Sequence, residues 1–107
     1  MNERGRDALI QAALAGRPQA IGHIYDRQHG HCALGILADD AGLLDKMMPD
    51  LVSIASLATI YDLAGLRPCP TGCGYRAIEV DLIAHLNDQH HWDFLSIAHK
   101  LGPEVEA

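Results

Sequence analysis

Residues 69–92 read CPTGCGYRAIEVDLIAHLNDQHHW. Three residues separate Cys69 from Cys73, eleven separate Cys73 from His85, and four separate His85 from His90. Structural zinc takes four nitrogen or sulfur ligands in a tetrahedron, and two cysteines with two histidines are one of its common ligand sets. The spacing therefore predicts a structural zinc site near the carboxyl end, with these four side chains as ligands.

The second histidine ligand has a rival in His91, because an interval of three to five residues after the first histidine admits both positions. We favour His90, since Trp92 and the next predicted helix follow His91 closely. Residues four or five apart on a helix lie roughly one turn on, so His85 and His90 can converge if the helix loosens near Asn87 and Asp88. A classical finger also has an aromatic residue where this chain has Ala77.

Two other interpretations of the cysteine pair stay open: two reduced thiols in a turn with histidines merely on a helix surface, or a CxxxC disulfide. Three cysteines cannot all pair within one chain, which favours metal ligation. Four protein ligands leave no position for water, and the sequence has neither HExxH nor the PCxxC signature of deaminases. We therefore expect a structural ion and name no catalytic residue.

Glycine and proline residues end helices and mark turns, and their positions here predict an all-α fold with very little strand. The helices are expected at 4–15, 32–41, 51–64, 78–89 and 94–101. Segment 51–64 is apolar on nearly every side, which predicts a central helix that Asp50 caps and Gly65 ends. Ile78 is expected on the buried stripe of the fourth helix. Residues 19–31 are expected to form a loop, and 67–74 a proline-rich turn.

The chain has 107 residues, a length that predicts one domain, 1–107, in which 68–101 is a zinc-finger-like subregion.

The formal net charge of the chain is −6, and its eight basic residues are scattered, which argues against nucleic-acid binding. No run of about 18 apolar residues predicts a membrane span, and the charged amino terminus does not resemble a signal peptide. We expect a soluble, cytoplasmic protein.

HGHC at 29–32 places His29, His31 and Cys32 just before a predicted helix. The cluster suggests a second metal site, or a thiol whose pKa a helix start lowers. The stronger interpretation is that Cys32 packs as a small hydrophobic side chain while the histidines occupy a polar loop.

Two stretches, CALGIL at 32–37 and LIAHLNDQHHWDFLSIAHKL at 82–101, resemble a family of small, mostly uncharacterised phage and bacterial proteins. That family shows a CALG or CCLG box, then LND, then Trp or Phe followed by IA, and the resemblance covers roughly half of this chain. In that family, a CP segment before HLND looks like part of a zinc site that has two pairs of ligands. The resemblance maps that site onto the same two cysteines, His85 and His90, whereas Asp93 departs from the usual Ser or Thr. It implies a phage or mobile-element setting and no mechanism.

Together these features predict a zinc-stabilised helical protein that acts as a protein-interaction or accessory module and not as an enzyme. Its partner is expected to be another protein or a second copy of the chain. The alternative is a metal-dependent nucleic-acid regulator that dimerises to gather its basic residues. A third class is a hydrolase that depends on zinc or on Cys32.

Overall fold

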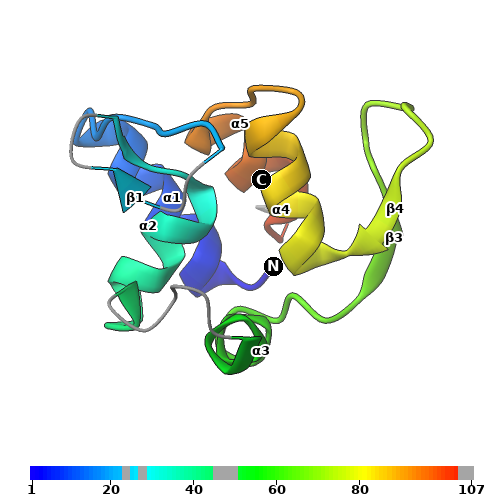
Figure 1. Ribbon diagram of the computed structural model, residues 1–107, viewed down its shortest axis with the longest axis horizontal. Coiled ribbons are helices and arrows are strands. Elements are labelled where there is room, and N and C mark those ends of the chain that lie inside the picture. The colour runs from blue at the N-terminus through cyan, green and yellow to red at the C-terminus, as the bar shows by residue number, and fades with distance from the viewer. Residues whose placement is uncertain (23–24, 27–28, 45–50, 104–107) are drawn as a thin grey trace.

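The computed structural model describes residues 1–22, 25–26, 29–44 and 51–103. Within these residues, five helices and four short strands follow one another. They are α1 (Glu3–Leu14), β1 (Tyr25–Asp26), β2 (Gly30–His31), α2 (Ala33–Asp40), α3 (Leu51–Ile60), β3 (Leu66–Pro68), β4 (Arg76–Ile78), α4 (Glu79–Asp88) and α5 (Phe94–Leu101). Helix α1 packs against α2 and α5, and α4 contacts α2, α3 and α5. Figure 1 shows the β3–β4 hairpin beyond α4, at the edge of the molecule.

The all-α prediction is wrong, because two antiparallel hairpins accompany the five helices. Strand β1 pairs with β2 inside the predicted loop, and β3 pairs with β4 around the predicted turn. Each strand has only two or three residues, which is too short for alternating polarity to stand out in the sequence. Pro68 also occupies the last position of β3, where proline speaks against a strand.

Three helices end with the backbone pattern of a Schellman motif, in which an N–H donates to the carbonyl five residues earlier. At the ends of α1 and α2 the left-handed residue is Gly16 or Gly42, with φ of 67° and 71°. Helix α3 ends in the same way at Asp62, whose φ is 56°, and so stops before the predicted Gly65. The predicted cap Asp50 lies outside the described residues.

The central helix is α4, and the prediction that 51–64 forms it is wrong. In α3, Leu57 is fully buried but Ala55 and Thr59 are exposed, so only one side of that helix meets the core. Helix α4 buries several side chains and contacts the three helices α2, α3 and α5. Its buried residues are Val80, Leu82, Ile83, Leu86 and Asn87. Ile78, expected on this stripe, precedes the helix and is 38% exposed.

Asn87 is a polar side chain in this core with no solvent exposure. Its Oδ1 accepts hydrogen bonds from Gln19 Nε2 at 2.8 Å and from the Ala33 backbone N–H at 3.0 Å. Its Nδ2 donates to the Ala20 carbonyl at 2.9 Å and to Asp88 Oδ1 at 2.8 Å. One amide thus joins α4 to the start of α2 and to the segment after α1, and all of its hydrogen-bonding groups are satisfied.

Replacing Asn87 by Ala should lower the free energy of unfolding by about 2–4 kcal/mol. The substitution leaves a buried N–H and a buried carbonyl without partners, and each such group costs about 1–3 kcal/mol. Urea unfolding followed by circular dichroism measures the change. Gln89→Ala, an exposed substitution at the end of the same helix, is the control and should change stability by less than about 0.5 kcal/mol. A loss below about 1 kcal/mol for Asn87→Ala contradicts the role given to this amide.

Candidate metal centre

The hairpin and the helix that follows it form a ββα unit, and the turn of the hairpin carries both cysteines. Cys69 follows β3 directly, and its backbone N–H donates to the Tyr75 carbonyl at 2.8 Å, which closes the turn. Gly72 and Gly74 have φ of 78° and 94°, a left-handed conformation that glycine adopts without steric cost. The turn is therefore tight enough for both sulfur atoms to face the same space.

The two histidines come from the last turn of α4 and from the residues just beyond it. His85 lies inside the helix, which ends at Asp88, and His90 follows the end. On a regular helix, side chains five positions apart point about 140° away from each other. Here the Trp92 N–H donates to the Leu86 carbonyl at 3.0 Å, one residue farther back than in a Schellman motif. The wider ending lets His90 turn back toward His85.

The sulfur and imidazole atoms of Cys69, Cys73, His85 and His90 all lie within 4.8 Å of one another. The two Nε2 atoms are 3.0 Å apart, and Cys73 Sγ is 3.4 Å from His85 Nε2. A zinc tetrahedron with Zn–S near 2.3 Å and Zn–N near 2.0 Å has edges of roughly 3.3–3.8 Å. The cluster therefore has the size and the donor set to hold a metal ion.

Two neighbours that the sequence pattern did not indicate support this cluster. Thr71 Oγ1 lies 3.0 Å from Cys69 Sγ and 3.3 Å from His90 Nε2. The Tyr75 ring stacks on the His85 ring, with centroids 4.0 Å apart and an interplanar angle of 14°. Tyr75 is an aromatic neighbour of the cluster that lies two positions before Ala77, the position at which a classical finger has its aromatic residue. The sequence did offer one signal for this contact, because Tyr75 is the aromatic residue nearest to the second cysteine, Cys73.

The two cysteines differ in environment. Cys69 is 5% exposed, whereas Cys73 lies open at the tip of the hairpin. Hydrogen bonds to the Cys73 sulfur, first from the Thr71 hydroxyl and then from the Tyr75 backbone N–H and the imidazoles, lower the pKa of this thiol to about 5. A thiolate at neutral pH is the form of cysteine that binds metals.

His91, the rival ligand, does not join the cluster. It is exposed and has a φ of 54°, so it occupies the left-handed position where the chain reverses after α4. Among the residues that the structure describes, only one group of three or more His, Cys, Asp or Glu side chains has metal-binding geometry, and His91 is outside it.

The HGHC segment forms no second group of that kind within the same residues. Cys32 is 4% exposed and caps α2, where its Sγ accepts a hydrogen bond from the Gly35 N–H at 3.4 Å. Burial raises the pKa of this thiol although it stands at a helix start. His31 Nδ1 lies 3.3 Å from Arg17 Nη2. These contacts favour the packing interpretation of Cys32 over the reactive one.

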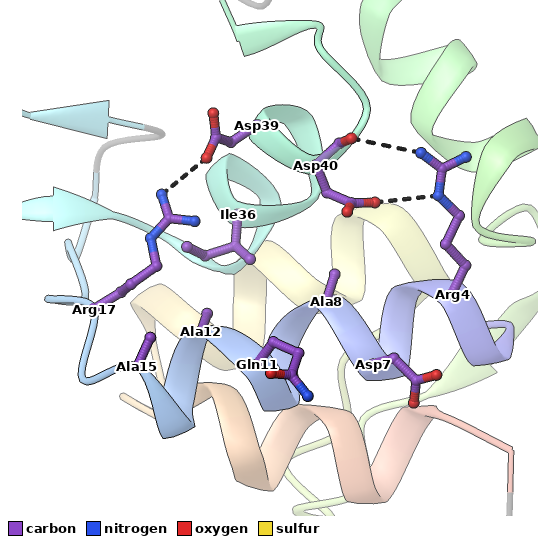
Figure 2. A pocket seen from close by; sticks show the side chains of 10 residues that line it. All are labelled: Arg4, Asp7, Ala8, Gln11, Ala12, Ala15, Arg17, Ile36, Asp39 and Asp40. Carbon is purple, nitrogen blue, oxygen red and sulfur yellow. Dashed lines mark hydrogen bonds and ion pairs between the residues drawn. The ribbon is translucent and has the colours of Figure 1, made fainter.

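A shallow pocket of about 610 Å³ lies elsewhere, between α1 and α2. Figure 2 shows its small apolar floor, which includes Ala12 and Ile36, with an arginine–aspartate pair at each end. The Arg17–Asp39 and Arg4–Asp40 pairs measure 3.0 and 3.2 Å. Each guanidinium at this pocket is thus already engaged by a carboxylate.

Among the described helices, none is long and apolar enough to cross a bilayer. Comparison of the chain with protein-family models, with curated proteins and with solved structures gives no match. The function of the cluster therefore has to be inferred from its own geometry.

Proposed function

We propose that this chain is a zinc-stabilised protein-interaction module whose ion fixes the β3–β4 hairpin against α4. The observation that supports this most directly is the convergence of two sulfur and two imidazole donors within 4.8 Å of one another. The donors come from a turn and from the end of the next helix, so an ion bound to all four joins the two elements. Zinc fits best, because it accepts mixed sulfur and nitrogen ligands in a tetrahedron.

A structural role fits this arrangement better than a catalytic one. A tetrahedral ion has four coordination positions, and the four donors fill all of them: Cys69, Cys73, His85 and His90. No position is left for water or substrate. A hydrolase based on Cys32 is also disfavoured. Its sulfur is buried, and the raised pKa of the thiol keeps it protonated at neutral pH.

The alternative function, a metal-dependent nucleic-acid regulator, meets an electrostatic obstacle. In finger proteins the helix enters the major groove. Here α4 carries Asp81 and Asp88 on the same face as His85, around a hollow of about 530 Å³. Carboxylates at that position repel phosphates. A protein partner, or a second copy of the chain, is the class of partner that we propose.

The wider setting rests on the resemblance alone. A phage or mobile-element origin would suit a small accessory module, and cysteines that form no disulfide would suit the reducing cytoplasm. Both remain predictions.

Protein purified without chelator should contain close to one zinc per chain. Removal of the ion with a strong chelator should lower the melting temperature by at least about 10 °C. At a structural site the free energy of metal binding adds to the free energy of folding. A stability change of about 1 kcal/mol shifts the melting temperature of a domain of this size by roughly 4–8 °C. Elemental analysis and thermal unfolding by circular dichroism measure the two quantities. Cys73→Ser should abolish zinc binding, and Cys32→Ala should leave it intact. A stripped protein that melts at the original temperature would show that the ion has no structural role.

Cobalt substitution should identify the second histidine ligand. We expect His90→Ala to weaken Co²⁺ binding by more than 100-fold and to remove the visible absorption of the tetrahedral ion. Loss of a direct ligand should exceed the 10–100-fold cost of losing an outer-shell partner. His91→Gly is the matched variant and should bind Co²⁺ normally, because glycine suits the left-handed backbone at that position. The reverse result would assign the ligand to His91.

A further inference from the structure

The hairpin differs in charge from the rest of the molecule. Residues 66–78 read LRPCPTGCGYRAI and contain Arg67 and Arg76 but no Asp or Glu, although the chain as a whole carries a net charge of −6. Within the described ranges, the ion pairs engage Arg4, Arg6, Arg17 and the terminal amine, whereas neither hairpin arginine lies in one. The carboxylate of Glu79, which follows β4, lies 2.5 Å from the Met1 amine. The hairpin is thus positively charged, with Arg76 exposed on one face of the strands and Arg67 half-buried on the opposite face.

The outer face of the hairpin also exposes apolar side chains. Leu66 and Ile78 are directly opposite each other across the two strands and are 59% and 38% exposed. Pro68 and Arg76 form another exposed cross-strand pair. Side chains two apart on a strand share a face, so these four residues form one surface, which we call the outer face. Figure 1 shows the hairpin at the edge of the molecule, away from α1 and α2.

We propose that the outer face binds an acidic, amphipathic segment of a partner protein. Apolar side chains of the segment would cover Leu66 and Ile78, and a carboxylate would pair with the guanidinium of Arg76, a group suited to bidentate binding of carboxylates. Four residues offer too little area for a globular interface of about 800 Å² per partner, so a short segment fits better than a folded surface. The inference rests on the proposed function, because the bound ion holds the hairpin in place.

Charge complementarity favours an acidic protein segment over nucleic acid as the ligand of the outer face. Two arginines are few for phosphate binding, which depends on many neutralised phosphates. Asp81 and Asp88 on the neighbouring helix face would repel a longer polyanion. A short segment with one or two carboxylates beside apolar residues meets neither difficulty.

Selection of a random dodecapeptide display library on the zinc-loaded chain tests the proposal. Enriched peptides should combine Asp or Glu with large apolar residues. In fluorescence anisotropy, Arg76→Glu and Leu66→Ser should each weaken their binding at least tenfold. Lys100→Glu, an equal charge reversal at an exposed site on α5, should weaken it less than twofold. Basic enriched peptides, equal losses in the Arg76 and Lys100 variants, or tighter binding of a labelled single-stranded oligonucleotide would each overturn the proposal.

Metal analysis of every variant separates this inference from the proposed function. Arg76→Glu and Leu66→Ser should keep close to one zinc per chain and the wild-type circular dichroism spectrum, because neither side chain is a ligand. If these variants keep zinc and still bind the peptides like wild type, the outer face is not the binding site and the zinc-stabilised module stands. If the wild-type protein holds no zinc, the proposed function itself fails.

Discussion

The buried amide of Asn87 is the interaction on which the arrangement of the helices depends. A buried polar group is stable only where each of its donors and acceptors finds a partner. For Asn87 those partners come from the segment at 19–20, from the start of α2 and from the adjacent Asp88. A shift of α4 by one residue would break all three long-range hydrogen bonds at once. The apolar core supplies most of the driving force for folding, and the amide selects the position at which the helices pack.

The same turn of α4 serves the core on one side and the cysteine–histidine cluster on the other. His85 and Asn87 are two residues apart, which places them about 200° apart around the helix axis. The hydrogen bonds of Asn87 fix the rotation of the helix, and that rotation aims His85 at the hairpin. His90 lies three residues farther on, where the widened helix ending and the left-handed His91 bring it back to His85. Packing of the core therefore prepares half of the cluster before any ion binds.

Regular spacing made the helices and the candidate ligands predictable from sequence, because glycines such as Gly16 mark helix ends and cysteine–histidine intervals reflect ligand geometry. The hairpins were not predictable, since two or three residues of strand carry no periodic signal and Pro68 suggests a turn. The apolar composition of 51–64 suggested a central helix, but Leu57 alone among the described side chains of α3 is fully buried. Composition measures how apolar a segment is and does not say which neighbours it meets. The role of Asn87 depends on residues 54 to 68 positions away, which no local pattern reveals.

The β3–β4 hairpin lacks a core of its own, and this explains why the cluster at its turn matters. Its three cross-strand pairs leave Leu66 and Ile78 exposed, and isolated two-stranded hairpins are marginally stable in water. Stabilisation therefore has to come from the ends: from the backbone bond between Glu79 and Gly65 at one end and from the cysteine–histidine cluster at the other. An ion bound to that cluster would hold the hairpin without burying its outer face. The exposed leucine and isoleucine are then not required for folding, and a surface freed from that requirement is available for contact with another molecule.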